Sequence, residues 1–224
     1  MNENYYEKLL DRLKDYFGKL ERTDEDFFHE LIKAILSQNT TDKNSIQAYN
    51  NLIKIINNDL KNLSNDGYYD KIKDSIKIAG LNNQKARTLC TLGEKFFSNQ
   101  KYSDIEERIK KMNISEVIST FLAIDGIGLK TISCAILFGL KKSAFPVDTH
   151  ISRIVQKIKN EKILKKDIQI EVEISIQDWE KIKALHLYLI ELGRSICRAK
   201  KQNCQICPIK ELCEDYRSRL PSSC

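Results

Sequence analysis

The sequence has few of the residues that break helices or build tight turns. Of its 224 residues, only 8 are glycine and 3 are proline. An all-β protein needs many tight turns, and these depend heavily on both residue types. No stretch of alternating apolar and polar residues indicates a β-strand either. The scarcity of turn residues therefore favours an all-α protein.

Long apolar runs are missing as well. No run reaches the roughly 18 apolar residues of a transmembrane helix. The first residues, MNENYYEKLLDRLKDYF, are charged and amphipathic and lack the apolar centre of a signal peptide. We therefore expect an intracellular protein, in the cytoplasm or nucleoid, without a membrane partner. The net charge of +6 is a weak bias towards a polyanion.

Apolar residues recur at helical spacing through most of the chain. Thr23 and Asp26 resemble a capping box before one helix, and Asp42 is expected to cap the next. The longest irregular piece of the second half, 141–148, contains Pro146 and indicates a domain boundary near residue 142. The clearest predicted helices cover 4–20, 69–78, 84–97, 130–139, 149–158, 168–173 and 178–196.

Four of the seven cysteines lie close together near the C-terminus, at Cys197, Cys204, Cys207 and Cys213. A disulfide framework would spread its cysteines along the chain and would need an oxidising compartment. Four thiolates in one compact loop suit either a tetrahedral Zn²⁺ ion or a [4Fe–4S] cluster. The spacing therefore predicts a metal site and leaves the choice between these two open.

The loop between the first two of these cysteines carries three cations, Arg198, Lys200 and Lys201. A metal-bound turn would hold them rigidly, which suits contact with phosphates. An ordinary solvated loop would have the same composition.

The segment 124–131 contains a second pattern, in which Gly126 and Gly128 separate two amphipathic helices. Glycine permits a tight turn and close approach of another backbone. The amides at the start of the following helix carry its positive dipole end, so they favour a phosphate. Helical hairpins often use glycine, so this pattern is weak on its own.

Lys130 and Asp148 form the third pattern. Lys130 starts the short predicted helix 130–139, and Asp148 ends the irregular segment that follows it. A lysine beside a helix N-terminus and an apolar wall has a lowered pKa and can act as a nucleophile. A carboxylate nearby can move protons. The residues alone favour a plainer interpretation, a solvated lysine and a helix-capping aspartate.

Together, the hairpin 124–131, the segment Val147-Asp148-Thr149-His150 and the four-cysteine loop resemble the endonuclease III family. These proteins are base-excision-repair DNA glycosylases with AP-lyase activity, and the resemblance covers about residues 25–214. It implies an all-α fold with two helical domains flanking a DNA-binding cleft. Residues 21–142 would form a six-helix domain with the hairpin, and residues 1–20 and 143–224 a cluster domain.

The resemblance also implies a mechanism. Lys130 matches the nucleophile, which displaces a damaged pyrimidine and then cuts the strand by β-elimination from a Schiff base. Asp148 matches the catalytic aspartate, and the four cysteines match the ligands of a [4Fe–4S] cluster. The expected partner is double-stranded DNA with a damaged base or an abasic site, bound by a monomer.

Removing a base from the stack leaves a gap, and the family fills this gap from two loops. The first aligns with 37–42, where either Gln38 or Asn39 would be inserted; the second is 80–83, where Leu81 would be the apolar wedge. Without the resemblance, Leu81 would be interpreted as a core contact. The other expected DNA contacts are Gly126, Gly128, Thr131, His150, Arg198, Lys200 and Lys201.

Asp125 departs from the family pattern, which commonly has proline there. We expect its side chain to point away from DNA and to cap the following helix. Three alternatives remain: a glycosylase of the same fold for mismatched thymine or modified cytosine, a non-catalytic DNA-binding module, and an iron–sulfur electron carrier.

Overall fold

The computed structural model describes residues 5–98 and 100–219. These residues form twelve α-helices joined by short turns and contain no β-strand, which confirms the all-α prediction. No helix among the described residues is long and apolar enough to span a membrane. The chain divides into two compact units. One spans Asp24–Leu140, and the other joins the segment up to Thr23 to the residues from Lys141 onward.

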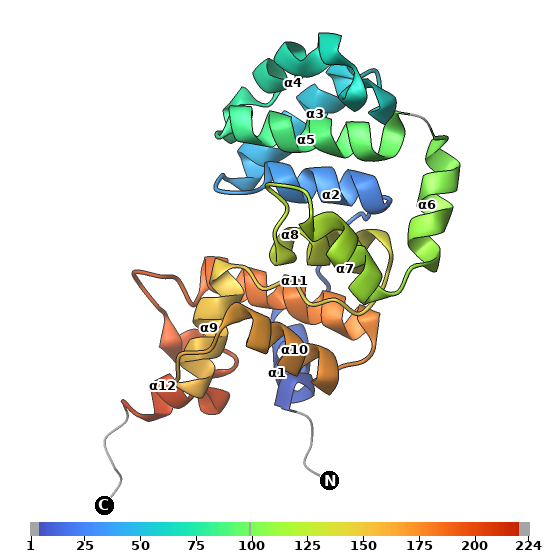
Figure 1. Cartoon of the computed structure of the whole chain (residues 1–224). Coiled ribbons are helices and arrows are strands. Elements are labelled where there is room, and N and C mark those ends of the chain that lie inside the picture. The colour runs from blue at the N-terminus through green and yellow to red at the C-terminus, as the bar shows by residue number, and fades with distance from the viewer. Residues whose placement is uncertain (1–4, 99, 220–224) are drawn as a thin grey trace, which may run out of the picture. The chain divides into compact units, whose positions relative to one another are not determined.

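Residues 24–140 are called the hairpin unit below (Figure 1). Its helices are α2 (Phe27–Leu36), α3 (Asp42–Ile55), α4 (Tyr69–Ser75), α5 (Asn82–Phe97), α6 (Tyr102–Lys111), α7 (Ile114–Leu122) and α8 (Leu129–Cys134). A π-helical turn, Ala135–Gly139, extends α8. Short 3₁₀ turns lie at Leu60–Ser64, Asp66–Tyr68 and Lys77–Ala79. The predicted helix 69–78 is thus interrupted at its end.

Helix α2 forms the centre of the hairpin unit, since eight of its ten residues are buried. Aromatic rings surround it, with centroids 4.8 to 6.1 Å apart in edge-on, tilted and stacked pairs. The rings belong to Phe27, Phe28, Phe96, Phe97 and Phe121, all of which are buried. Full burial of such side chains contributes roughly 1.5–3 kcal/mol each. This packing joins the start of α2 to the end of α5 and to α7.

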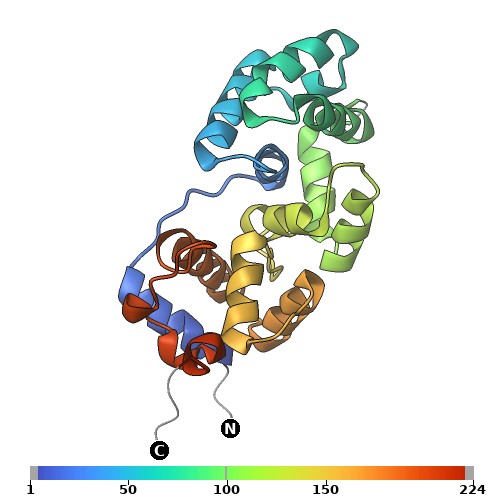
Figure 2. The same ribbon diagram turned by 90° about the vertical axis from the view of Figure 1, so that its left-hand side faces the viewer.

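The remaining described residues, 5–23 and 141–219, are called the cysteine unit. Its helices are α1 (Tyr5–Phe17), α9 (Thr149–Lys159), α10 (Lys165–Ser175), α11 (Trp179–Ser195) and α12 (Glu214–Arg217). Helix α11 packs against both α1 and α9 (Figure 2). The Tyr5 hydroxyl donates to the carbonyl of Leu212 at 2.9 Å, and the Tyr188 hydroxyl donates to that of Gly18 at 2.7 Å. These bonds fasten the N-terminal helix to the C-terminal half of the chain.

The structure corrects two predicted helix starts. Asp26 is not the third position of a capping box begun by Thr23; its own carboxylate caps α2 by accepting two backbone amides. Thr41, rather than Asp42, caps α3, because its hydroxyl accepts the bond and Asp42 already lies inside the helix. In both cases the sequence offered two neighbouring residues with capping side chains, and local geometry selected one.

Candidate active site and nucleic-acid interface

The turn between α7 and α8 depends on glycine at one position. Gly126 has φ +89°, and a Cβ there would lie 2.1 Å from Thr88 Oγ1. The Thr88 hydroxyl occupies this space because it donates a hydrogen bond of 2.8 Å to the carbonyl of Asp125. Helix α5 therefore holds the turn from one side, and any side chain at Gly126 would displace it.

Helix α2 holds the same turn through Gln38, which follows its C-terminus. The Gln38 amide donates to the carbonyl of Gly126 at 2.9 Å and to Thr131 Oγ1 at 3.1 Å. Thr131 is only 3 % exposed. Contact between its hydroxyl and a phosphate would require this arrangement to open. The geometry shows Gln38 and Thr131 as residues that support the turn.

The start of α8 is open. Gly128 is its N-cap, no side chain accepts its first amides, and a Cβ at Gly128 would meet nothing within 4 Å. Asp125 is exposed and does not cap this helix, so that expectation is wrong. The reason is geometric, since Gly126 and Ile127 separate Asp125 from the N-cap position. Gly128 thus leaves room for another backbone to approach closely.

Lys130 is the second residue of α8 and is half-buried. Within residues 5–98 and 100–219, its ammonium has no ion pair and no hydrogen bond. Asp148 is the N-cap of α9 in the cysteine unit, and its Oδ1 accepts the amide of Ile151 at 2.8 Å. The plainer interpretation of Asp148 as a helix cap is therefore correct in geometry. Its second oxygen has no hydrogen bond to a described residue and stays available for other chemistry.

Four exposed side chains of the hairpin unit stand on left-handed backbone, those of Asn39, Asn57, Asn58 and Leu81, and two of them belong to the loops expected to touch DNA. Asn39 has φ +51°, and Leu81 has φ +50° immediately after Gly80 at φ +69°. This conformation is uncommon for asparagine and a genuine outlier for leucine. Leu81 is 50 % exposed, so the interpretation of it as a core contact is wrong. Of the two candidates in the first loop, Asn39 is exposed, whereas the side chain of Gln38 is bound to the hairpin.

The four clustered cysteines are all half-buried. Burial raises the pKa of Cys197 and of Cys213, and it raises the pKa of Cys207 to about 11. The other sulfurs of the group add to the rise in pKa of each of these thiols. Cys204 contributes to the rise in pKa of all three of these thiols.

The donor set fits an iron–sulfur cluster. No three Cys, His, Asp or Glu side chains of the described chain are arranged to hold a single metal ion. A [4Fe–4S] cluster binds each cysteine through a different iron, so its ligands need not converge on one point. A set of four cysteines from one loop, with sulfur as the only donor atom, matches this requirement.

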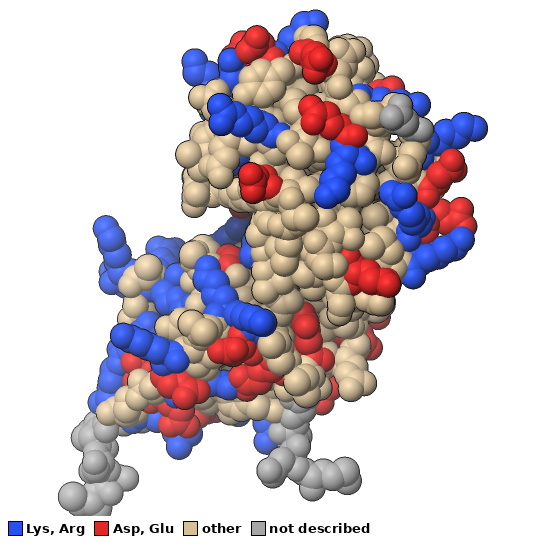
Figure 3. All heavy atoms as spheres, viewed as in Figure 1, with Lys and Arg blue, Asp and Glu red and all other residues tan. Residues whose placement is uncertain are grey.

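The loop 198–203 forms a closed turn within the cysteine unit. An isolated antiparallel bridge joins Cys197 to Gln202, and the amide of Asn203 donates to the carbonyl of Ile196 at 3.0 Å. The cations of this turn, Arg198, Lys200 and Lys201, are all exposed. On the face shown in Figure 3, basic and acidic side chains are interspersed over both units. The charge of this turn is therefore a local feature.

Arg153 is a residue that sequence reasoning missed. Its guanidinium donates to the carbonyls of Gly193 at 3.1 Å and Cys197 at 2.8 Å, and it lies 3.3 Å from His150 Nδ1. The helix that starts at Asp148 is thereby fastened to the first cysteine of the loop. The only sequence signal was the one-turn spacing of His150 and Arg153.

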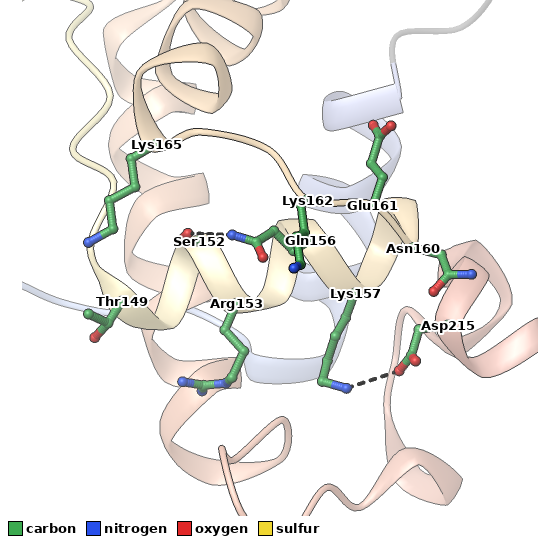
Figure 4. Close-up of a pocket in the computed structure, with 10 residues that line it drawn as sticks. All are labelled: Thr149, Ser152, Arg153, Gln156, Lys157, Asn160, Glu161, Lys162, Lys165 and Asp215. Carbon is green, nitrogen blue, oxygen red and sulfur yellow. Dashed lines mark hydrogen bonds and ion pairs between the residues drawn. The ribbon is translucent and has the colours of Figure 1, made fainter.

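A groove also runs along α9 in the cysteine unit (Figure 4). It begins at Thr149, next to Asp148, and four cations and two carboxylates lie along it. One pair is already formed, because Lys157 donates to Asp215 at 3.1 Å. The surplus of cations suits an anionic chain. The lining residues are Thr149, Ser152, Arg153, Gln156, Lys157, Asn160, Glu161, Lys162, Lys165 and Asp215.

Two helical units with a helix-hairpin-helix turn and a four-cysteine loop define the class of base-excision DNA glycosylases. The sequence pattern of the HhH-GPD superfamily of base excision DNA repair proteins matches residues 32–177. The chain therefore belongs to this superfamily, and the resemblance to endonuclease III is confirmed.

Two relatives match over most of their length. A protein of Methanocaldococcus jannaschii, whose assignment as a DNA repair glycosylase is itself provisional, is 32% identical over 95% of this chain and 99% of its own. Endonuclease III of Rickettsia felis is 32% identical over 87% of this chain and 86% of its own. The chain is thus similar to DNA glycosylases along nearly its whole length.

Solved structures share the fold. An endonuclease III–DNA complex superposes with a TM-score of 0.73 at 20% identity and covers 95% of both chains. A thermostable thymine-DNA glycosylase superposes with a TM-score of 0.74 at 19% identity, covering 96% of this chain and 97% of its own. These two values are nearly equal, so the fold alone does not distinguish the substrates.

Proposed function

We propose that the protein is a bifunctional DNA glycosylase and AP lyase that removes damaged pyrimidines from duplex DNA. The observation that carries this proposal is Lys130. It lies in the first turn of α8, directly after the open glycine turn, and its ammonium has no partner among the described residues. A lysine without an internal partner in a DNA-binding hairpin is suited to act as a nucleophile.

The reaction requires Lys130 as a neutral amine. Its nitrogen attacks C1′ of the damaged nucleotide, and the bond from C1′ to the base breaks as the base leaves with a proton. The bond from C1′ to the ring oxygen then breaks as this oxygen takes up the proton of the amine. The ring-opened adduct is a Schiff base, which acidifies the C2′ proton. Loss of that proton and of the 3′ phosphate oxygen cuts the strand. The second half requires an amine nucleophile such as Lys130, since attack by water or a hydroxyl group forms no Schiff base.

Asp148 would stabilise the positive charge that develops on the sugar as the base departs. One of its oxygens is occupied by the cap of α9, which fixes the carboxylate in orientation. The other oxygen is free of hydrogen bonds to described residues, as an electrostatic role requires. A cap and a catalytic carboxylate are compatible in one residue.

Asn39 and Leu81 would fill the space that the extruded nucleotide leaves. Both are exposed and stand on fixed backbone, and an apolar wedge beside the opposite base is a common way to stabilise an opened stack. Gly128, His150 and the cations of loop 198–203 would contact the DNA backbone, together with the groove along α9.

Cys197, Cys204, Cys207 and Cys213 would hold a [4Fe–4S] cluster. When bound, it supplies four cross-links within the loop, while glycosidic cleavage and β-elimination consume no electrons. The cysteine unit then presents loop 198–203 in one conformation. Arg153, which donates to the carbonyl of Cys197, would pass this constraint on to the helix that starts at Asp148.

Borohydride trapping tests the mechanism. The protein should form a covalent adduct with duplexes that carry an abasic site or thymine glycol. Lys130→Ala should abolish the adduct while DNA binding persists, and Lys95→Ala, at an exposed lysine of α5, should trap normally. Asp148→Asn should bind DNA but turn over slower by about 10²–10⁴-fold.

A G:T mismatch duplex belongs in the same assay, because the thymine-DNA glycosylase fold is equally similar. Release of thymine without trapping would replace the proposed substrate and the lyase step. Folded protein that binds DNA but neither releases a base nor traps would leave only a binding module. Equal loss of trapping and binding in Lys130→Ala would point to misfolding and would not support the assignment.

A further inference from the structure

Lys85 is a buried lysine in the first turn of α5, and the chemistry above does not use it. It is 1 % exposed. Lysine is almost never fully buried unless it is paired, because the charged form loses its hydration. No carboxylate lies within ion-pair distance of Lys85 among residues 5–98 and 100–219. This side chain therefore has an unusual environment that needs a physical explanation.

Three backbone carbonyls surround the ammonium. Nζ donates to Leu36 O at 2.9 Å, to Gln38 O at 2.8 Å and to Ala79 O at 2.9 Å. A protonated lysine has three N–H donors, so each has one acceptor. Burial lowers the pKa of Lys85, but only the charged form can satisfy all three carbonyls.

These three carbonyls belong to the two loops that carry Asn39 and Leu81. Leu36 ends α2, and Gln38 immediately precedes Asn39. Ala79 precedes Gly80 and Leu81. The loops are far apart in sequence, and one ammonium joins their backbones. Both loops then leave this point with positive φ, which is held only where the surroundings determine it.

We propose that Lys85 is a positioning residue that sets the backbone of both loops, so that Asn39 and Leu81 enter the opened DNA stack together. This role rests on the proposed function, since it assigns the two loops a common task on DNA. Lys85 does not touch DNA or the reacting atoms. It acts through Asn39 and Leu81, so its removal should matter only while these side chains are present.

The test is a double-mutant cycle read without catalysis. The probe is a duplex with a tetrahydrofuran abasic analogue and 2-aminopurine opposite it, whose fluorescence reports the opened stack. The measured quantity is the affinity for this duplex relative to an unmodified one. Lys85→Met should lower that ratio about tenfold. Affinity for unmodified DNA depends mainly on phosphate contacts, so it should change less than about twofold.

In the Leu81→Ala background, Lys85→Met should lower the affinity ratio much less, because the side chain that Lys85 positions is already gone. Lys85→Arg keeps donors to the carbonyls and should restore most of the ratio. In Lys85→Met, hydrogen exchange should rise in segments 37–42 and 80–83. Leu63→Ala removes another buried side chain of the hairpin unit and serves as the control for a simple loss of stability. It should lower the melting temperature without changing the fluorescence or the ratio.

Two outcomes would overturn the role of Lys85. One is an additive cycle, in which Lys85→Met costs the same with and without Leu81. The other is an equal effect of Leu63→Ala at matched stability. If Lys85→Met fails to fold, Lys85→Gln takes its place in the cycle with the same expectations. Wild-type protein that shows no preference for the abasic duplex would refute the proposed function and this role together, whereas a preference with an additive cycle would refute this role alone.

Discussion

The hairpin turn and the cysteine loop contrast in how their polar groups are satisfied. In the hairpin turn, Thr88 of α5 and Gln38, just after α2, donate to the carbonyls of Asp125 and Gly126. In the cysteine loop, the four cysteines are half-buried, and the Cys213 thiol has only backbone partners, among them the carbonyl of Lys157 at 3.6 Å. One region is completed by its own side chains, and the other contains a group of donors suited to a cluster.

This difference indicates where each region obtains its rigidity. The hairpin turn should keep its form in the isolated polypeptide, because its contacts come from buried helices. The cysteine loop should depend on the bound cluster, because binding energy at such a site is folding energy. Substitutions in the two regions should therefore produce separable effects on the two units.

The largest expected effect is the loss of one cluster ligand. Cys204→Ser should prevent cluster assembly and destabilise the cysteine unit by more than about 4 kcal/mol, since loss of a structural metal is among the most damaging changes. Hydrogen exchange should rise through α9 and α11 while α2 and α5 remain protected. Iron and sulfide content and the thermal melting curve provide the measurements.

Cys90→Ser is the matched control, because Cys90 is a half-buried cysteine of the hairpin unit outside the loop. It should leave the iron content and the exchange of α9 unchanged. An unaltered melting temperature in Cys204→Ser would show that the loop is stable without a cluster. Equal loss of protection in both units would show that the contrast between them is wrong.

The next effect should come from the glycine that the hairpin requires. Gly126→Ala places a Cβ against Thr88 Oγ1 on backbone with φ +89°, and we expect a loss of about 3 kcal/mol from strain and from a broken hydrogen bond. Urea unfolding measures it. Gly128→Ala is the control, because a Cβ there meets nothing. It should keep nearly full stability yet weaken DNA binding, and equal destabilisation by both would contradict the difference between the positions.

A smaller effect should appear with pH at the start of α2. Burial raises the pKa of Asp26, but hydrogen bonds from His29 and Tyr102 outweigh it and lower this pKa to about 2. The bond to Asp26 raises the pKa of His29 against the opposing effect of its burial. Asp26 contributes to the free energy of unfolding above its unfolded pKa of 3.8, and this contribution is lost as the pH falls towards 2. His29 contributes to the free energy of unfolding below pH 6.5, and this contribution is lost as the pH rises through its folded pKa.

Stability of the hairpin unit should therefore be greatest between about pH 4 and 6.5 and fall by about 1–2 kcal/mol on the acid side. Urea titrations at several pH values, read by hydrogen exchange of α2, test this. Asp26→Asn should flatten both arms of the profile. Asp178→Asn, at the cap of α11 where the carboxylate accepts only backbone amides, should leave the profile of α2 intact. A profile of α2 that Asp26→Asn does not change would contradict the assignment.

Helical periodicity was sufficient to predict an all-α fold, because this pattern is local in sequence. The same local signals could not choose between Thr41 and Asp42 as a cap, since both side chains are competent. They also could not predict the exposure of Leu81, which follows from the positive φ of two successive residues. Lys85 gave no signal, because its three acceptors are backbone carbonyls separated by up to 49 positions from it. Long-range bonds to backbone have no sequence signature.

The smallest expected effect concerns the exposed cations of the cysteine loop. Lys200→Ala and Lys201→Ala remove exposed charges that have no ion pair with another described residue, so stability should change by less than about 0.5 kcal/mol. If each lysine contacts a phosphate, the slope of log affinity against log salt should fall by about 1 for each. Removing Lys110 and Lys111, which pair with carboxylates on α6, subtracts the same charge from the hairpin unit as a control. An equal change of slope in the Lys200→Ala/Lys201→Ala double variant and in the control that lacks Lys110 and Lys111 would mean that net charge, rather than the position of the loop, attracts the DNA. The cysteine loop would then serve only to support its own unit.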